Sequence, residues 1–217
     1  LSVVALAGIV VNNNIVLVDT YNVLKRNSIN LKEKDIPQEV NLINKITNIM
    51  DKLECKNIIF FSSIKVYGEN SFNFDFINED FPKHPQCFYG KAKAECEKVL
   101  INSSGKKKFN YLIFRMPPVL MNNPGTNLGK LFKLVEIGLP IPSFRIGDLN
   151  QRSFLNYDLL VHVLKEILIK EKILKSNIFN LCDTEAVSTN NLSFGIFLKV
   201  LAKSVDFLNV TTPLADI

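Results

Sequence analysis

Two short apolar runs, residues 57–62 and 110–116, constrain the fold of this chain more than any other feature of its sequence. Both runs are rich in β-branched and aromatic residues, and both have the length of a strand that is buried on its two faces. Apolar residues at helical spacing occupy 39–54 before the first run and 88–102 between the two runs. Strands that alternate with helices in this way predict an α/β fold with a parallel sheet.

The second half of the chain continues the same alternation with shorter segments. Two prolines follow directly after the run at 110–116, so that strand is expected to end there. We expect an extended piece over 152–157, a strand over 176–183, and helices over 127–137, 158–170 and 189–203.

The composition is that of an ordinary globular protein, since 47% of the residues are hydrophobic and 22% are charged. The net charge of +5 is mild, and the one basic run, at 105–108, lies between a helical pattern and a strand. We therefore expect a solvated loop there and no nucleic-acid partner. The four cysteines and two histidines show no metal-ligand spacing, which predicts reduced cytoplasmic thiols and no metal site.

Tyr89 and Lys93 are four residues apart on the helix expected over 88–102, so both side chains project from one face. A phenol, with a pKa of about 10, is a poor base at neutral pH, and a neighbouring ammonium lowers that pKa. Such a pair suits an enzyme that removes a hydroxyl proton while a hydride leaves the same carbon. The spacing alone is common, however, and a surface tyrosine beside a surface lysine produces it equally well.

The sequence around this pair carries further motifs in a recognisable order. They read FFSSIKVYGEN, NEDFPKHPQCFYGKAKAECEKVL, FRMPPV, QRSFLNYDLL and FNLCDTEAVSTNNL. Together, from about residue 38 to about residue 205, they resemble the extended short-chain dehydrogenase/reductase family and its NAD-dependent epimerase/dehydratase group. The resemblance implies a Rossmann-type fold, NAD as the cofactor with NADP left open, and a nucleotide-diphosphate sugar as the substrate.

The resemblance also implies roles for individual residues. Tyr89 matches the catalytic base of the family, and Ser63 matches the hydroxyl that hydrogen-bonds the reacting sugar. Lys93 matches the lysine that holds the nicotinamide ribose and lowers the pKa of the tyrosine. The cofactor contacts implied in the same way are Tyr89, Lys93, Asn41, Ser62 and Pro117.

Two arginines match substrate contacts of the family, together with Ser63. Arg115 stands at the end of the strand beside the nicotinamide, and Arg152 resembles an arginine that grips the substrate diphosphate. A fork-shaped guanidinium suits that task because it binds phosphate oxygens in pairs. The resemblance further implies a homodimer that forms through the helices at 39–54 and 88–102.

The two residues after Ser63 favour epimerisation over dehydration. Dehydratases of this group carry acidic residues there, which serve as acid and base on neighbouring sugar carbons. This chain has Ile64 and Lys65 at those positions, and neither offers a carboxyl group. The expected activity is therefore that of a UDP-glucose 4-epimerase-like enzyme.

The N-terminal segment has a different character. Residues 1–18 carry no charge and include three consecutive asparagines at 12–14. Residues 1–24 resemble a transmembrane helix of the resistance-nodulation-division efflux pumps, so we expect an N-terminal hydrophobic helix that can associate with a membrane. Residues 25–37 are polar and are interpreted as a linker.

A second interpretation takes residues 14–22 as a strand of the enzyme that ends in a ribose-binding acid, Asp19. We set it aside because the segment from Asp19 to Asn41 is too short for the helices and the strand expected between them.

The glycine-rich turn that this family places against the NAD pyrophosphate is not found in the sequence, since Gly8 is the only glycine before Gly68. We therefore expect weak NAD binding and a truncated Rossmann-type sheet with a reduced substrate subdomain. The expected division is a transporter-like helix over 1–24, a linker over 25–37 and a partial epimerase/dehydratase domain over 38–217. Removing the first segment should improve solubility. A membrane-anchored dehydrogenase, a transporter fragment and a non-catalytic remnant that binds sugar nucleotides are left open as alternatives.

Overall fold

The structure is a computed structural model that divides the chain into two compact units. The first unit comprises Leu1–Pro117 and Leu160–Leu181, and the second comprises Pro118–Leu159 and Cys182–Ile217. The helix expected over 189–203 and most of the helix expected over 127–137 lie outside the described residues. The residues that the structure describes are 8–11, 15–18, 36–69, 76–120, 130, 133–134, 137, 151–169 and 175–188.

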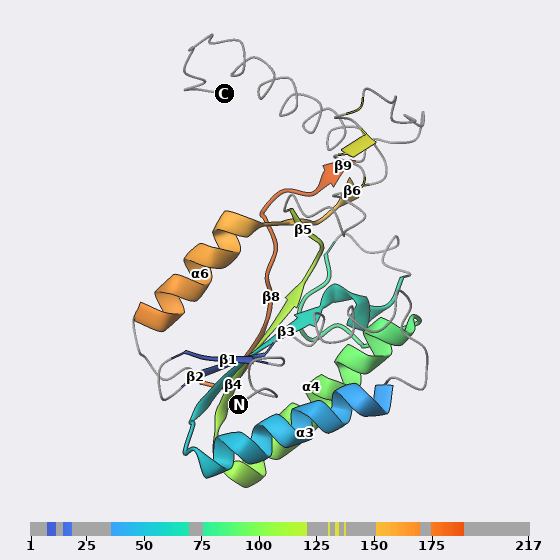
Figure 1. The fold of residues 1–217 in the computed structure, drawn as a ribbon. Coiled ribbons are helices and arrows are strands. Elements are labelled where there is room, and N and C mark those ends of the chain that lie inside the picture. The colour runs from blue at the N-terminus through green and yellow to red at the C-terminus, as the bar shows by residue number, and fades with distance from the viewer. Residues whose placement is uncertain are drawn as a thin grey trace. The chain divides into compact units, whose positions relative to one another are not determined.

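A five-stranded sheet forms the centre of the first unit, with the strand order β1-β2-β3-β4-β8 (Figure 1). The three neighbouring pairs from β2 to β8 are parallel, whereas β1 is antiparallel to β2. The expected α/β fold with a parallel sheet is thereby confirmed. The strands are β1 (Gly8–Val11), β2 (Ile15–Val18), β3 (Asn57–Ser63), β4 (Asn110–Met116) and β8 (Asn177–Asn180).

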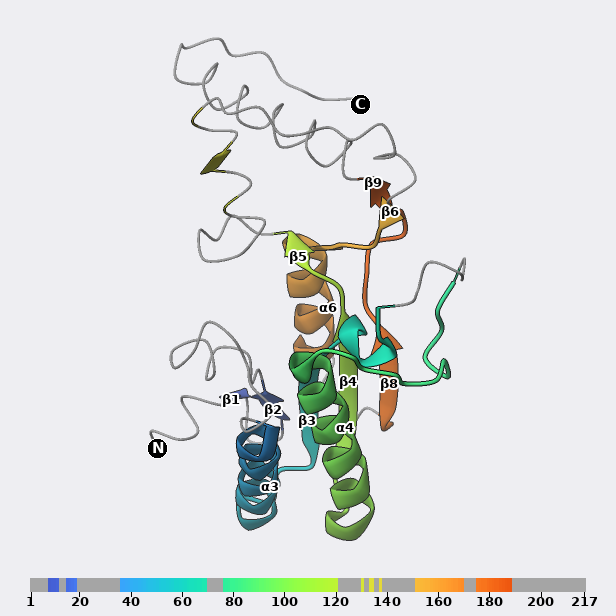
Figure 2. The same cartoon turned by 90° about the vertical axis from the view of Figure 1, so that its right-hand side faces the viewer.

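Helices connect the parallel strands, as a crossover between such strands requires. Helix α3 (Ile36–Lys52) comes between β2 and β3, and helix α4 (Phe88–Lys107) comes between β3 and β4. The two helices lie side by side on one face of the sheet, as Figure 2 shows. A short 3-10 helix, η2 (Ile64–Tyr67), follows β3, and helix α6 (Tyr157–Ile169) precedes β8.

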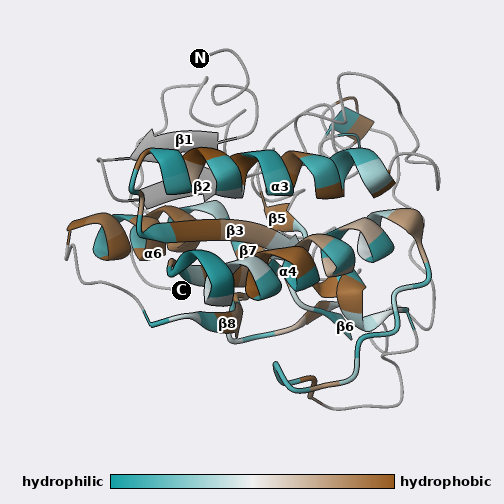
Figure 3. Cartoon of the chain, turned by 90° about the horizontal axis from the view of Figure 1, so that it is seen from below, coloured by the Kyte–Doolittle hydropathy of each residue, from teal (hydrophilic) through white to brown (hydrophobic). Residues whose placement is uncertain are grey.

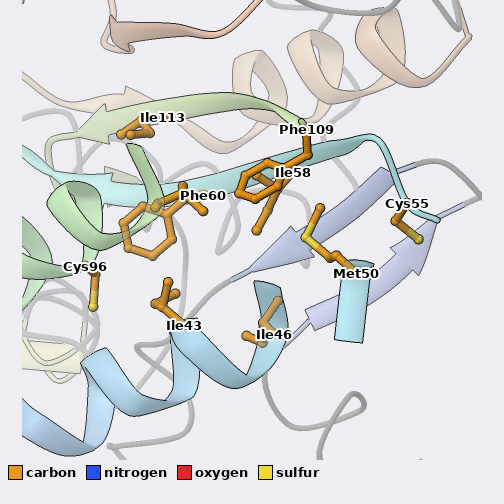
Figure 4. Close-up of a cluster of buried hydrophobic side chains, with 10 residues drawn as sticks. Ile43, Ile46, Met50, Cys55, Ile58, Phe60, Cys96, Phe109 and Ile113 are labelled. Atoms are coloured by element: carbon orange, nitrogen blue, oxygen red, sulfur yellow. The ribbon is translucent and has the colours of Figure 1, made fainter. Parts of the chain in front are cut away.

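Strands β3 and β4 are buried on both faces because their alternate side chains enter two separate cores. Ile58, Phe60 and Ile113 pack against side chains of the two helices. Figure 4 labels four of these side chains, Ile43, Ile46 and Met50 of α3 and Cys96 of α4. Ile59 and Leu112 point the other way and pack against α6. This arrangement explains why both runs are continuously apolar, which is visible for β3 in Figure 3, and it confirms the interpretation of the two runs as buried strands.

The expected N-terminal hydrophobic helix is wrong for the residues that the structure describes. Residues 8–11 and 15–18 are the strands β1 and β2, and the likeness of residues 1–24 to a transporter helix is not supported. Both strands consist almost wholly of valine, isoleucine and leucine, and β-branched residues favour strands. Asparagine, which fills the sequence between them, is typical of turns. Among the described residues, no helix is long and apolar enough to cross a membrane.

The structure favours the second interpretation of the N-terminal segment, which places a strand of the enzyme within residues 14–22. Strand β2 runs parallel to β3, with Ile15 opposite Asn57 and Val18 opposite Phe60. The single helix α3 is enough to connect two neighbouring parallel strands, so the distance to Asn41 is not too short. Of the linker expected over 25–37, residues 36 and 37 begin α3, and the rest lies outside the described residues.

The described residues of the second unit form two small two-stranded sheets. Strand β5 (Val119–Leu120) is parallel to β7 (Leu155–Asn156), and β6 (Gln151–Arg152) is antiparallel to β9 (Val187–Ser188). The backbone N–H of Asp183 donates to the carbonyl of Phe154 at 2.8 Å, which joins the two chain segments of the unit.

Candidate active site

The carboxyl ends of three parallel strands place polar side chains in one row. Arg115 of β4 stands opposite Ser62 of β3 on one side and opposite Asn180 of β8 on the other. Open parallel sheets bind their ligands at this edge. The expected site residues at the ends of β3 and β4 therefore lie where this kind of fold places its chemistry.

Ser62 and Ser63 end β3, and their hydroxyls have different partners. The Ser62 hydroxyl donates a short hydrogen bond to a carboxylate oxygen of Glu97. The Ser63 hydroxyl accepts from the backbone N–H of Lys65 at 3.3 Å and caps η2. Both side chains are buried, Ser63 with 8% of its surface exposed, so this turn of chain is fixed to the end of the strand.

The first turn of α4 packs directly on η2. A Cβ added at Gly90 would lie 2.5 Å from the backbone carbonyl oxygen of Lys65, a distance that no real Cβ keeps. Glycine is thus needed at this position because the two backbones approach so closely. The Cys87 thiol caps the helix by accepting from the Gly90 N–H at 3.4 Å. Tyr89, between these two residues, is thereby held next to the segment that follows Ser63.

Lys93 lies one turn further along α4 and is fully buried. Its Nζ donates to the carbonyl oxygen of Phe61 at 2.8 Å and lies 5.6 Å from the centre of the Tyr89 ring. A second ring, that of Phe60, has its centre 5.0 Å from the same nitrogen. The phenol and the ammonium do share one side of the helix, and an aromatic ring next to an ammonium is an attractive arrangement.

Arg115 is the centre of a buried polar network. Its Nε and one terminal nitrogen donate to the two carboxylate oxygens of Glu97, at 3.1 and 2.8 Å. The other terminal nitrogen donates to the Tyr67 hydroxyl at 2.8 Å and to the Glu79 carbonyl at 2.9 Å. Tyr67 in turn donates to the side-chain oxygen of Asn180 at 2.6 Å. We call Ser62, Tyr67, Glu97, Arg115 and Asn180 the carboxyl-edge cluster.

The charges of this cluster shift each other's pKa. Burial alone would raise the pKa of Glu97, but hydrogen bonds from Arg115 and Ser62 and the charges of Arg115 and Lys83 outweigh it and keep that pKa below its usual value. Burial would likewise lower the pKa of Arg115, and the contacts with Glu97 and Tyr67 raise it instead. Both side chains are therefore ionised at neutral pH and form a buried ion pair.

The geometry offers no substrate contact from Arg115. Its side chain is 2% exposed, and its donors face the Glu97 carboxylate, the Tyr67 hydroxyl and the Glu79 carbonyl. The family resemblance implies such a contact from the place of Arg115 in the sequence. The sequence does not show that the buried carboxylate of Glu97 faces the guanidinium.

The other expected residues occupy different places. Pro117 is buried just after β4, and Asn41 is exposed on α3. Arg152 is exposed in β6 of the second unit. In the first unit the structure thus brings Tyr89 and Lys93 close to the carboxyl ends of β3 and β4. These two residues share one face of α4.

Sequence reasoning missed Glu97, although a signal for it exists. Glu97 follows Lys93 at the spacing by which Lys93 follows Tyr89, so the three residues continue one face of α4. A carboxylate on a helix face that contacts the sheet needs a cation, and β4 contains a single arginine. Lys83, which is partly exposed, adds a second cation 3.1 Å from the Glu97 carboxylate.

Among the residues that the structure describes, no group of three or more histidine, cysteine, aspartate and glutamate side chains is arranged to hold a metal ion.

Comparison with known proteins identifies relatives for most of the chain. The model of the NAD dependent epimerase/dehydratase family matches residues 22–182. A curated relative, the UDP-glucose 4-epimerase of Vibrio cholerae, is 33% identical over 138 residues, which make up 62% of this chain and 40% of that protein. The chain thus spans less than half the length of this relative.

Solved epimerases share the fold. The UDP-N-acetylglucosamine 4-epimerase of Bacillus cereus superposes with a TM-score of 0.66 at 20% identity, over 82% of this chain and 60% of that one. The UDP-glucose 4-epimerase of Thermotoga maritima, solved with UDP-glucose, gives a TM-score of 0.63 at 19% identity, over 82% and 56%. The UDP-glucuronic acid 4-epimerase of Bacillus cereus in complex with NAD gives 0.62 at 20%, over 70% and 49%. This chain belongs to the NAD-dependent epimerase/dehydratase family.

Proposed function

We propose that this chain carries the proton-transfer residues of an NAD-dependent nucleotide-sugar epimerase. The observation that carries the proposal is the position of Tyr89 and Lys93 on one face of α4, against the end of β3 that bears Ser62 and Ser63. Support also comes from the curated relative and the solved neighbours, which are sugar-nucleotide 4-epimerases. The expected substrate class is a nucleotide-diphosphate sugar of the UDP-hexose kind.

The residues at the carboxyl edge fit the ribose and nicotinamide end of NAD. An ammonium, two hydroxyls and a phenol, from Lys93, Ser62, Ser63 and Tyr89, are suitable partners for ribose hydroxyls and a carboxamide. Lys93 and Ser62 are buried and already donate to the Phe61 carbonyl and to Glu97, so NAD would use the remaining donors of the ammonium and the acceptor side of the hydroxyl. When bound, NAD accepts a hydride from the sugar carbon and returns it. The pyrophosphate of NAD would be held by a glycine-rich turn, and this sequence contains none, so the residues present fit one end of the cofactor.

The protein side chains would handle the proton of the sugar hydroxyl. Tyr89 takes that proton as the base and gives it back when the hydroxyl reforms. Ser63, at the end of β3, hydrogen-bonds the same oxygen and fixes its position. The buried Lys93 ammonium beside the Tyr89 ring favours the anionic form of the phenol.

The residues after Ser63 support epimerisation over dehydration. The exposed Lys65 ammonium forms an ion pair with Glu69 at 2.9 Å on the surface, and Ile64 has no ionisable group. Loss of water from the sugar would need a positioned acid for the leaving hydroxyl.

Other parts of the proposal concern binding and assembly. Arg152 is the candidate for the substrate diphosphate, since its guanidinium stands in the exposed strand β6. The pair of helices α3 and α4 is the candidate surface for a homodimer. The unit comprising Pro118–Leu159 and Cys182–Ile217 is the candidate substrate subdomain.

Replacing Tyr89 by phenylalanine tests the proposal. We expect Tyr89→Phe to lower turnover of UDP-hexoses at saturating NAD by roughly 10²–10⁴-fold, the usual contribution of a positioned base. The control is Tyr111→Phe, which removes a phenol near the beginning of β4, at the opposite end of that strand from Arg115, and should leave turnover unchanged. Products are identified by NMR.

Three results would overturn the assignment. Formation of a 4-keto-6-deoxy sugar would exclude an epimerase. Full activity of Tyr89→Phe would exclude the catalytic role of the phenol. Binding of UDP-hexoses without turnover would favour a non-catalytic sugar-nucleotide binder instead.

A further inference from the structure

The helix that carries Tyr89 and Lys93 is attached to β3 at two consecutive residues. Lys93 donates to the carbonyl of Phe61, and Glu97, one turn later on α4, accepts from the hydroxyl of Ser62. These contacts fix both the height of the helix over the strand and its rotation about its own axis. A shift of α4 by one residue would break both contacts at once.

The ion pair of Glu97 with Arg115 makes this attachment specific. Glu97 and Arg115 are 0% and 2% exposed, so water cannot replace either ion-pair partner if the pair separates. Arg115 contacts the Glu97 carboxylate through two nitrogens, which only a planar guanidinium can do. If α4 moved, the ion pair would break and the buried Arg115 charge would keep only the neutral Tyr67 hydroxyl and Glu79 carbonyl as acceptors. The cost of that state disfavours any other register of the helix on the sheet.

Apolar contacts of α4 lie elsewhere on the helix. Cys96 and Leu100 enter the core that α3, β3 and β4 share, and these contacts tolerate small displacements because dispersion and burial are not directional. The turn that contains Lys93 is held in addition by the polar contacts to Phe61 and Ser62, which are directional. The same guanidinium reaches the carbonyl of Glu79, so the segment before α4 is tied to the cluster as well.

We propose that Glu97 and Arg115 are positioning residues of the active site. Their ion pair holds the Tyr89–Lys93 face of α4 in register with the carboxyl end of β3, and it thereby sets the place of the Lys93 ammonium. The proposal rests on the proposed function in that Tyr89 and Lys93 are the catalytic pair. Glu97 and Arg115 themselves act only through these two residues.

The test measures the chemical reactivity of Lys93 and needs neither cofactor nor turnover. The folded 217-residue chain is acylated briefly with acetic anhydride, and mass spectrometry gives the labelling of Lys93 relative to that of Lys91 and Lys98. Those two lysines are exposed on the same helix and serve as internal references. Glu97→Gln should raise the relative labelling of Lys93 on the order of tenfold, because the turn opens when one partner of the buried pair is lost.

A core variant separates positioning from general loss of stability. Leu100→Ala destabilises α4 through the apolar core and leaves the carboxyl-edge cluster intact, so the relative labelling of Lys93 should stay within about twofold of the wild-type value. All variants are labelled at a temperature at which circular dichroism shows them folded. An equal rise in Leu100→Ala would show that Glu97 contributes only stability, and would overturn the proposal.

A double variant keeps the test decisive if Glu97→Gln does not fold. Glu97→Gln combined with Arg115→Met leaves no unpaired buried charge, yet it also lacks the contacts that set the register. We expect raised Lys93 labelling here too, and wild-type labelling would refute the positioning role. Because labelling does not depend on turnover, an inactive protein with the expected labelling would disprove the proposed function but leave this inference standing.

Discussion

A buried carboxylate is stable as an anion only if other groups replace the water that it has lost. Glu97 receives hydrogen bonds from Ser62, from Lys83, and from Nε and one terminal nitrogen of Arg115, which is why its pKa lies below the usual value although burial acts in the opposite direction. At the residue scale, the candidate site therefore depends on a balance of charges that no single side chain provides.

This balance predicts how stability depends on pH. A carboxylate whose pKa is lower in the folded state adds stability above its unfolded pKa of about 4.3 and loses it as the pH falls through the folded value. Glu97→Gln removes this contribution and leaves Arg115 buried without its partner. The free energy of unfolding at pH 7 should fall by about 3–5 kcal/mol.

The difference between wild type and Glu97→Gln should shrink as the pH falls below the unfolded pKa of about 4.3, because the unfolded chain then takes up the proton first, and it is lost once the pH has passed through the lowered pKa of the folded carboxylate. Urea unfolding at a series of pH values measures it. The matched control is Glu95→Gln, which removes an exposed carboxylate of the same helix, 3.8 Å from Lys98, and should cost no more than about 1 kcal/mol. A constant difference between pH 7 and pH 3 would contradict the role assigned to the Glu97 charge.

The contrast between Glu95 and Glu97 shows what a sequence reveals at this scale. Both glutamates stand in the same short segment, ECEK, yet one is exposed and the other is fully buried. The helical spacing of Tyr89 and Lys93 was enough to predict a shared face, and the structure confirms it. Glu97 is on helix α4 and its partner, Arg115, is on strand β4. A contact between two separate elements cannot be inferred from the sequence pattern of either one.

At the element scale, the close packing of the first turn of α4 on η2 fixes the position of the helix, and with it the position of Tyr89, relative to the end of β3. Alanine is a better helix former than glycine, so Gly90→Ala would stabilise an isolated helix by about 1 kcal/mol. In the protein the new methyl group would meet the carbonyl oxygen of Lys65 at 2.5 Å and the Cβ of Pro85 at 3.1 Å. Because a backbone carbonyl cannot turn aside like a flexible side chain, one of the two elements must move.

We therefore expect Gly90→Ala to destabilise the protein by about 1–3 kcal/mol, the usual cost of overpacking, and to lower turnover in the assay described for Tyr89. Gly105→Ala provides the control on the same helix, because nothing lies within 4 Å of a Cβ added there. This second change should stabilise by roughly 0.5–1 kcal/mol. Thermal unfolding of the two variants gives both values, and a stabilised Gly90→Ala variant would mean that α4 does not rest on η2 as described.

Elements differ in how far they could be predicted. Strands β3 and β4 were predictable because their runs are apolar on both faces and bounded by polar or proline residues. Strands β1 and β2 were not, because four apolar residues in a row are compatible with a strand or with part of a buried helix. The pairing partner decides between the two, and for β2 that partner is β3, far along the chain.

At the scale of the whole molecule, β2 protects one side of β3. Every residue from Asn57 to Phe60 has a partner on β2 and another on β4, so this strand, which is buried on both faces, lies in the interior of the sheet. The sequence alone suggested that residues 1–24 were foreign to the enzyme and that their removal would improve solubility. The register of β2 on β3 leads to the opposite expectation.

Deleting residues 1–18 should make the protein less stable and less soluble. The deletion would leave the N–H and C=O groups of β3 that face β2 without partners, and an unpaired apolar strand is a site for association with other chains. The shorter deletion of residues 1–7, which ends before β1, serves as the control and should behave like the full chain. Size-exclusion chromatography and thermal unfolding of the three chains test the expectation. If the chain lacking residues 1–18 eluted with the same oligomeric state as the full chain and were equally stable, β1 and β2 would not contribute to the sheet and β3 would need no partner on that side.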